Sequence, residues 1–494
     1  MSGKGNNYYA ALKATTLFGG IQVVQILVQL IRSKFLAVLI GPYGIGYLGL
    51  INNSLSLLEA FTGLGIATSA IKPISNAHTN NPVELGKIVW TVRRLILVTG
   101  LFGCICTALL SPLLSIWTFG DTTKTMVFLL VSISILFNQA YSGNISLLKG
   151  VRANKGIASV VLVGNILSLI LTIPLYYLLG ISGIVPGIIL ISLVNFCLSS
   201  WQVKRQDIPT RNAESGLFSR DARQIIFMGI MISLSSVMTL GSSYLLRIYI
   251  NLEDGLSTVG LYNSGFALIT TYVGLVFTAM SLDYFPRIAA VSDNNLIMYQ
   301  IVNQQAEIAI LILGPIICTF ILLLNTVVVL LYSTAFLPVV PMLFWAAIGV
   351  LLRGVTWSIG YIFLAKSDNK VFFLSELLSN FYFLILSILG YKFLKLEGLG
   401  IAYLVGYTIS LVQVYAIAKV RYSYSIDKRV VKVVIMHFLF VLVLMAVVYL
   451  MSGLVRYISG FVIIASSAVY SVYVISNTIS FKEVILSIKT KVAK

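Results

Sequence analysis

Long runs without any charged residue dominate this sequence and restrict its fold more than any other feature. No Asp, Glu, Lys or Arg occurs in residues 156–203, 308–352, 433–455 or 457–481. A helix needs about 20 apolar residues to cross the hydrocarbon core of a bilayer, so each of the first two runs is long enough for two crossings. Only 10% of the 494 residues are charged, whereas a soluble domain carries about 25%. The chain is therefore predicted to be an all-α polytopic membrane protein and not a soluble enzyme.

Gly and Pro residues between the apolar stretches divide the chain into about 14 predicted transmembrane helices. The predicted spans cover residues 15–40, 44–71, 88–113, 125–148, 157–179, 183–201, 225–250, 259–285, 300–323, 339–365, 371–391, 398–418, 433–453 and 457–478. The N-terminal segment is polar as far as Lys13 and has no convincing signal-peptide cleavage site. The first apolar stretch is therefore expected to remain as a span.

The basic residues give an independent prediction of orientation. If the N-terminus is cytoplasmic, most of the 34 lysines and arginines fall in cytoplasmic connections or in the C-terminal tail. The predicted outer side receives only Lys124, Arg247, Lys392, Lys395 and Arg456. This asymmetry is the positive-inside pattern and predicts that both termini are cytoplasmic. The net charge of +18 is spread over many loops, so it does not indicate a nucleic-acid-binding patch.

Two segments of the chain are similar to each other and suggest an internal repeat. GLINNSLSLLEAFTGL (49–64) and GLYNSGFALITTYVGL (260–275) share several residues, including a final Gly-Leu pair. Each copy would hold six helices and keep the same orientation, which makes a parallel repeat. The predicted domains are a lobe of six helices (1–201), a cytoplasmic linker (202–223), a second six-helix lobe (224–420), and two extra helices with a basic cytoplasmic tail (421–494).

Polar residues inside the spans are the candidates for function, because placing them in a bilayer costs free energy. In the first span, Gln22, Gln25, Gln29 and Arg32 lie on one side of a helix at 100° per residue. Lys34 lies off this stripe, where it can face another helix or extend toward the interface. The stripe is consistent with substrate binding or with hydrogen bonds between helices.

Two charged residues are predicted to lie deep in the membrane. Glu59 is near the middle of the second span, where it is either a carboxylate that responds to protons or sodium or half of a structural ion pair. Arg353 is near the middle of the tenth span, with Trp357 one turn away and no carboxylate close in sequence. Because arginine stays charged, Arg353 needs a partner such as a carboxylate, water or an anionic substrate.

Three further ionisable residues lie nearer the predicted ends of spans. Glu376 and Glu307 are shallow, where water at the interface would solvate them; they are additional candidates for ion coupling. Arg247 is close to the outer end of its span, where its side chain could extend to the interface, and it is a weaker candidate for substrate binding.

A GxGxxG pattern occurs at Gly44, Gly46 and Gly49. In dinucleotide-binding proteins this pattern joins a strand to a helix. Here it follows a predicted membrane helix, so it is interpreted as a turn with close helix packing and not as a cofactor site.

The chain resembles the Wzx-type polysaccharide flippases of the multidrug/oligosaccharidyl-lipid/polysaccharide exporter superfamily. The resemblance extends over residues 10–420 and rests on the order and spacing of several stretches. These are KATTLFGG (13–20), SKFLAVLIGPYGIG (33–46), IKPISNAHTNNP (71–82), LLKGVRANKG (147–156), FPRIAAV (285–291) and LLRGVTWSIGYIFLAKS (351–367).

This resemblance implies a function and a set of partners. It implies alternating access that moves an undecaprenyl-pyrophosphate-linked oligosaccharide, an O-antigen or other surface polysaccharide unit, from the cytoplasmic to the periplasmic leaflet of the bacterial inner membrane. Arg32, Lys34 and Arg353 match basic positions thought to hold the pyrophosphate, and which of Arg32 and Lys34 is used stays open. A polysaccharide polymerase and a chain-length regulator are implied partners. No cofactor is expected beyond a coupling proton or sodium ion.

Two other classes of function compete with a flippase. A drug antiporter of the same superfamily would place carboxylates in its cavity for cationic drugs, but the deepest predicted charges here are mainly basic. A membrane glycosyltransferase or polymerase would usually need a sizeable outer loop with an acidic catalytic motif, and the predicted outer loops are short. Both remain alternatives at this stage.

Overall fold

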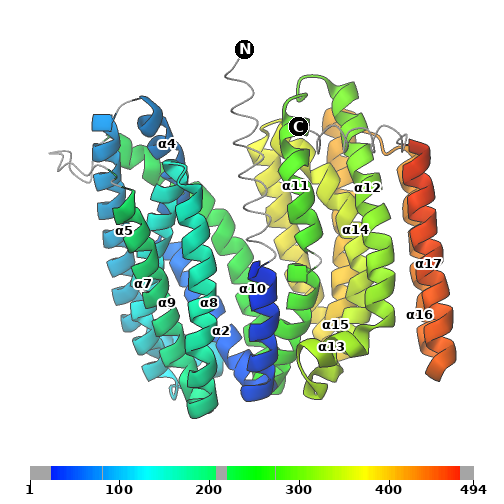
Figure 1. The fold of residues 1–494 in the computed structure, drawn as a ribbon, viewed down its shortest axis with the longest axis horizontal. Helices are drawn as coiled ribbons and strands as arrows, with labels where there is room; N and C mark the ends of the chain where they lie inside the picture. The colour runs from blue at the N-terminus through cyan, green and yellow to red at the C-terminus, as the bar shows by residue number, and fades with distance from the viewer. Residues whose placement is uncertain (1–23, 81, 207, 209–219, 273, 479–494) are drawn as a thin grey trace, which may run out of the picture. The chain divides into compact units, whose positions relative to one another are not determined.

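The computed structural model describes residues 24–80, 82–206, 208, 220–272 and 274–478 (Figure 1). Every regular element in these ranges is a helix, which confirms the predicted all-α class. The chain divides into two compact units. The first unit holds Met1–Leu261 with Leu330–Ala335, and the second holds Tyr262–Val329 with Phe336–Lys494. The predicted domain boundary at the 202–223 linker lies mostly outside the described residues and stays a prediction.

The first unit is a bundle of long helices with shorter pieces at the turns. A helix over residues 24–39 comes first. It is followed by α2 (Gly41–Thr62), α3 (Ile66–Ser69), α4 (Ile71–Asn80), α5 (Pro82–Leu109), α6 (Ser111–Phe119), α7 (Thr125–Gly150), α8 (Asn154–Leu179), η1 (Gly180–Gly183), α9 (Ile184–Arg205) and most of α10 (Arg220–Ala267). Ile51 and Ile135 belong to one buried apolar cluster, which packs α2 against α7, and Val89 belongs to a second, which packs α4 and α5 against α7.

The second unit has the same all-helical character. Its elements are η2 (Leu268–Tyr272), α11 (Gly274–Ala289), α12 (Asn295–Leu322), α13 (Leu324–Leu331, in part), η3 (Thr334–Val339, in part), α14 (Val340–Ala365), α15 (Asn369–Tyr422), α16 (Lys428–Leu450) and α17 (Gly453–Thr478). Helix α14 is the most central of these, because most of its residues are buried against α12 and α15.

The helices have the length and surface of membrane spans. In the described residues, nine helices are long and apolar enough to cross a bilayer, or up to ten if the bent pair Gly41–Thr62 and Ile66–Thr79 forms one span. Three of the nine, Asn154–Arg205, Ile225–Thr270 and Asn369–Tyr422, have 46 to 54 residues, more than twice what one crossing needs. Non-helical backbone at Gly180, Gly255 and Lys395 divides these three helices. Each can therefore supply two crossings, and the total of fourteen stays a prediction.

Large apolar side chains on the outside of the bundles agree with a lipid environment. Tyr177 and Leu178 are 75% and 76% exposed, and Tyr449 is 88% exposed. A soluble protein rarely leaves contiguous apolar surfaces of this kind in water. The chain is thus a multi-pass membrane protein.

Close packing between two helices explains the GxGxxG pattern. A Cβ on Gly46 would lie 1.9 Å from the carbonyl oxygen of Leu256, and one on Gly260 would lie 1.8 Å from that of Pro42. The backbones of α2 and α10 therefore touch directly, as small residues allow. Close helix packing is confirmed for Gly46, but the predicted turn is wrong, because Gly44, Gly46 and Gly49 all lie within α2.

Polar contacts at one end of the second unit join the two ends of α15 and connect α12 to the segment after α15. The Asp368 carboxylate accepts hydrogen bonds from Arg421 Nε at 2.7 Å and Tyr422 OH at 3.0 Å. Burial raises the pKa of this carboxyl, but these hydrogen bonds outweigh it and hold the pKa below its usual value. Asn303 contacts the segment after α15, donating to the Ser425 carbonyl and accepting from Tyr424 OH.

The two C-terminal helices dock on α12 through a buried histidine. His437 on α16 is completely buried, and its Nε2 lies 3.0 Å from Ser471 Oγ on α17. Its ring fills a notch at Gly314 on α12, where a Cβ would lie only 1.9 Å from the ring. The hydrogen bond thus joins α16 to α17, and the fit of the ring into the notch packs α16 against α12.

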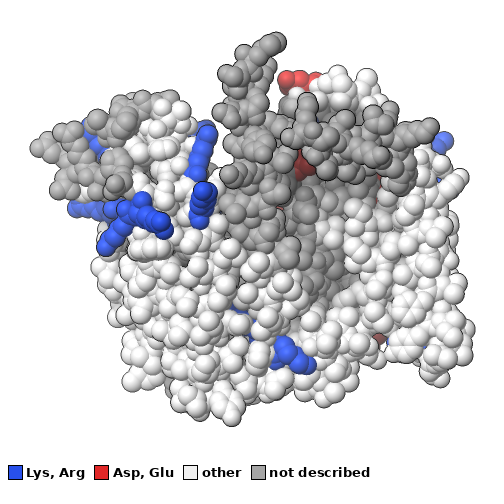
Figure 2. Space-filling model, in the orientation of Figure 1, with Lys and Arg blue, Asp and Glu red and all other residues white. Residues whose placement is uncertain are grey.

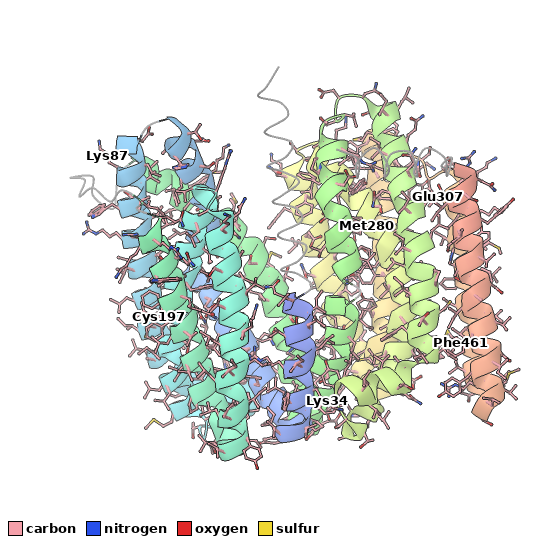
Figure 3. All side chains as sticks on the ribbon, in the orientation of Figure 1. Lys34, Lys87, Cys197, Met280, Glu307 and Phe461 are labelled. Carbon is pink, nitrogen blue, oxygen red and sulfur yellow. The ribbon has the colours of Figure 1, made fainter. Side chains whose placement is uncertain are left out.

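The orientation of the chain gives a first prediction. Lys and Arg side chains gather at the end of the first unit that carries α4 and the start of α5 (Figure 2). Lys87 lies at this end and Lys34 toward the other (Figure 3). We expect cysteines introduced at Asp121, Asp254 and Lys395 to react with an impermeant thiol reagent in intact cells, and a cysteine at Asn212 not to react.

The four native cysteines must first be replaced for this labelling experiment, because Cys197 is exposed. Permeabilised cells provide the control, since all four introduced cysteines should then react. Labelling at Asn212 in intact cells would overturn the predicted topology.

Candidate substrate site

Arg353 lies near the middle of α14, and its half-buried side chain is surrounded by aromatic residues of the second unit. Its Cζ is 5.1 Å from the centroid of the Phe277 ring on α11 and 5.9 Å from that of Tyr407 on α15. Both distances lie within the range of cation–π attraction. The aromatic rings thus stabilise a positive charge deep in the helical bundle.

The hydrogen-bond donors of Arg353 are mostly unused within the described part of the chain. A guanidinium carries five N–H donors. One of them reaches the Tyr403 hydroxyl at a long distance of 3.4 Å, and no described carboxylate lies within 4.0 Å of the group. A planar fork of N–H donors suits the oxygens of a phosphate or carboxylate. The arrangement can therefore accept an anionic ligand without breaking an ion pair.

Trp357 continues this aromatic cluster one turn further along α14. Its ring centroid lies 5.3 Å from Phe277, 5.6 Å from Tyr284 and 4.9 Å from Tyr361. Tyr284 is fully buried and its hydroxyl donates to the Ser358 carbonyl at 2.6 Å. The cluster thus joins α11 firmly to α14 beside Arg353.

The two additional acidic candidates of the second unit have different surroundings. Glu376 is exposed near the start of α15 and interacts electrostatically with Tyr407, a ring that contacts Arg353. Glu307 is only 8% exposed on α12, and the start of α16 brings the charges of Arg429 and Asp427 near it. The structure therefore differs from the expectation that water at the interface solvates Glu307.

In the first unit, Glu59 is held by two adjacent amide side chains of α7. Asn138 Nδ2 donates to Glu59 Oε1 at 2.7 Å, and Gln139 Nε2 donates to the Glu59 backbone carbonyl at 2.9 Å. No basic side chain of the described chain lies within 4.0 Å of the carboxylate. Neutral amide donors can bind either a carboxylate or a carboxylic acid oxygen, so this site tolerates both protonation states.

The helix that carries Glu59 breaks one turn later. Helix α2 ends at Thr62, and Leu64 and Gly65 have φ values of +49° and +60°. The backbone of Gly65 touches that of Gly229 on α10, which leaves no room for a side chain. The helix in the region of the predicted second span, 44–71, is therefore not continuous but bent by 57° at this point.

A second break occurs at the position that the internal repeat matches. The predicted eighth span, 259–285, is interrupted by the π-helical turn η2, and α11 begins at Gly274. Gly274-Leu275 corresponds to Gly63-Leu64 in the repeat alignment. Interrupted helices at corresponding positions of two repeats are a pointer to binding sites in transporters. Glu59 lies one turn before the first break and Phe277 one turn after the second.

The first-span candidates lie on the helix over residues 24–39. Gln29 is exposed, whereas Gln25, Arg32 and Lys34 are half-buried; Gln22 lies outside the described residues. Arg32 Nε is buried without a hydrogen-bond partner in the described part of the chain. The Tyr176 hydroxyl is also buried without a hydrogen-bond partner in the described part of the chain. It interacts electrostatically with Arg32.

Arg247 is placed differently from the expectation that its side chain could extend to the interface. It is 7% exposed on α10, and its Nη1 donates to the carbonyl and hydroxyl oxygens of Ser243. The side chain thus folds back along its own helix.

Several residues that surround Arg353 and Glu59 were not identified from the sequence. They are Phe277, Tyr403, Tyr407, Asn138 and Gln139. Tyr403 and Tyr407 are four residues apart and so share a helix face, and Asn138-Gln139 is an adjacent polar pair inside an apolar run. These patterns could have marked the residues as candidates. The sequence does not show which residues they contact, because those lie 50 to 80 residues away in the chain.

The fold is similar to that of solved transporters. The lipid II flippase MurJ, in an inward closed conformation, superposes with a TM-score of 0.71 at 14% identity, covering 94% of this chain and 99% of that one. An inward-facing multidrug resistance MATE family transporter of the MOP superfamily superposes with a TM-score of 0.69 at 15% identity, covering 81% and 94%. This chain therefore has the polytopic helical fold that these flippases and multidrug transporters share.

Sequence comparison then identifies the family. The profile of the polysaccharide biosynthesis protein family matches residues 35–341, more than half of the chain, so the protein belongs to this family. The lipid III flippase of Escherichia coli (strain K12) is 23% identical over 367 residues, which are 74% of this chain and 87% of the relative. These relatives are named as flippases or transporters, which confirms the prediction of a transporter and not an enzyme.

Proposed function

We propose that this protein is a flippase for undecaprenyl-pyrophosphate-linked oligosaccharides, such as O-antigen or another surface polysaccharide unit. It moves them by alternating access from the cytoplasmic to the periplasmic leaflet of the bacterial inner membrane, with both termini in the cytoplasm. The observation that carries the proposal is the guanidinium of Arg353, held among aromatic rings in mid-helix with unused donors. Membership of the polysaccharide biosynthesis family and the likeness to a lipid III flippase support it.

In this proposal Arg353 binds the diphosphate group. Hydrogen bonds between a charged donor and a phosphate oxygen are about twice as strong as neutral ones, and the paired geometry adds specificity. Arg32 or Lys34 supplies a second cation, with Gln25 and Gln29 as neutral donors along the same helix. Arg247 is a weaker candidate because its own helix already satisfies part of its guanidinium. A polysaccharide polymerase and a chain-length regulator remain proposed partners.

A drug antiporter is the main competing function, because multidrug exporters share the fold. A cationic drug would be repelled by Arg353, which lies near the middle of α14. Glu59 could attract such a drug in the first unit, but Asn138 already occupies one of its oxygens. An anionic substrate therefore fits the described charges better.

Deletion of the gene tests the proposed function directly. We expect lipid-linked oligosaccharide to accumulate facing the cytoplasm, so that an impermeant lectin no longer labels it on spheroplasts. Total lipid-linked oligosaccharide, measured after lysis, should not fall. Re-expression of the wild-type protein should restore labelling. Normal labelling in the deletion strain, accompanied by increased sensitivity to cationic drugs, would instead identify an antiporter.

A further inference from the structure

The side of α14 that carries Arg353 continues as a stripe of aromatic residues and one glycine. Trp357, Gly360 and Tyr361 follow Arg353 by four, seven and eight residues. At 100° per residue, these positions lie on one side of the helix. Trp357 is about 6 Å and Tyr361 about 12 Å from Arg353 along the helix axis. The stripe therefore extends away from the guanidinium in one direction.

The ring of Trp357 is positioned by its neighbours without being stacked by them. The plane of the Trp357 ring makes angles of 51°, 40° and 64° with the ring planes of Phe277, Tyr284 and Tyr361. None of these contacts is a parallel stack, and both Trp357 and Tyr361 are only half-buried. The two aromatic rings are thus oriented by buried residues while part of their surface stays accessible.

Gly360 leaves open space beside these rings. A Cβ at Gly360 would find no atom of the described residues within 4 Å. The other glycines of α14 are different, because a Cβ would lie 3.0 Å from Leu313 at Gly354 and 2.8 Å from Tyr403 at Gly349. Helix packing accounts for Gly349 and Gly354, but not for Gly360. The absence of a side chain at Gly360 keeps room on the same side as the aromatic rings.

We propose that Trp357, Gly360 and Tyr361 form a subsite for the sugar ring that is attached directly to the diphosphate. A pyranose has an apolar C–H face that packs on aromatic rings, and ligand sites combine such surfaces with a few fixed polar groups. Arg353 would hold the diphosphate at one end of the stripe. The sugar would then occupy the space beside Gly360, with the rings of Trp357 and Tyr361 against it. This inference rests on the proposed function, because it assumes a diphosphate at Arg353.

Two matched probes separate the subsite from the diphosphate site. The purified protein in nanodiscs is titrated with farnesyl diphosphate and with farnesyl-diphospho-N-acetylglucosamine, and binding is measured by microscale thermophoresis. We expect the wild type to bind the sugar-bearing probe about tenfold more tightly, a gain typical of an aromatic contact. Trp357→Leu should remove this preference and leave the affinity for farnesyl diphosphate unchanged.

Gly360→Leu provides a second variant that fills the space without removing a ring. It should weaken binding of the sugar-bearing probe alone. Trp345→Leu, which removes an indole from the opposite end of α14, is the control and should behave like the wild type. The proposed subsite would be contradicted if Trp357→Leu still bound the sugar-bearing probe more tightly. It would also be contradicted if this variant bound both probes more weakly by the same factor. Failure of farnesyl diphosphate to bind the wild type would count against the proposed function instead.

Discussion

Replacement of Arg353 by alanine is expected to abolish transport while the protein still inserts in the membrane. Hydrogen bonds to charged groups contribute about 1.5–3 kcal/mol each, so loss of the guanidinium should weaken diphosphate binding by roughly 10- to 100-fold. Arg353→Lys should restore transport only in part, because lysine keeps the charge and loses the planar fork. Arg32→Ala should also abolish transport if Arg32 supplies the second cation. The measurement is surface labelling of lipid-linked oligosaccharide in a deletion strain that expresses each variant.

Arg205→Ala is the matched control for this experiment. Arg205 also lies over an aromatic ring, that of Trp201 at 5.6 Å, but at the end of α9. Its loss should leave transport near the wild-type level. Wild-type export by a well-expressed Arg353→Ala protein would remove Arg353 from the substrate site.

Replacement of Glu59 by glutamine is expected to separate transport from its driving force. A driving ion acts only through a difference in affinity for the two states of a transporter. Glutamine keeps the size of Glu59 and can still accept the hydrogen bond from Asn138, but it cannot carry a charge or exchange a proton. Substrate binding should therefore remain. The ratio of the flipping rate with a proton or sodium gradient to the rate without it should fall to about one. Flipping in liposomes with and without each gradient measures this ratio.

Glu84→Gln is the control, because Glu84 is exposed in the first turn of α5. It should keep the response to the gradient. If Glu59 had a structural role only, through its contact with Asn138, Glu59→Gln should leave the response to the gradient unchanged. Gradient-dependent flipping by a well-expressed Glu59→Gln protein would eliminate the coupling role. Glu376 and Glu307 would then be the next candidates.

Hydropathy and charge alone predicted the class of the fold and many of its helices. The predicted spans at 125–148, 157–179 and 339–365 correspond closely to α7, α8 and α14, because each lies in a long apolar run between polar turns. The breaks after Thr62 and at Leu268–Tyr272 were not predicted. The second contains no Gly or Pro, so nothing in its local composition distinguishes it from a continuous helix.

The site was predicted less completely, for a physical reason. Periodicity shows which residues share a face of one helix, and it therefore identified Arg353 with Trp357 as neighbours. It cannot show which helices face each other. The pairing of Arg353 with Tyr403 and Tyr407, and that of Glu59 with Asn138 and Gln139, depends on packing between distant segments. The burial of Arg247 and Glu307 was missed because a position near the end of a span does not reveal its neighbours.

The notch at Gly314 limits which substitutions the contact between α12 and α16 can tolerate. A side chain at position 314 would collide with the ring of His437, so a larger residue at this position of α12 requires a smaller one at position 437 of α16. Removal of α16 and α17 would therefore leave the notch at Gly314 on α12 unfilled. The packing of α12 in this protein thus depends on a ring that the hairpin supplies.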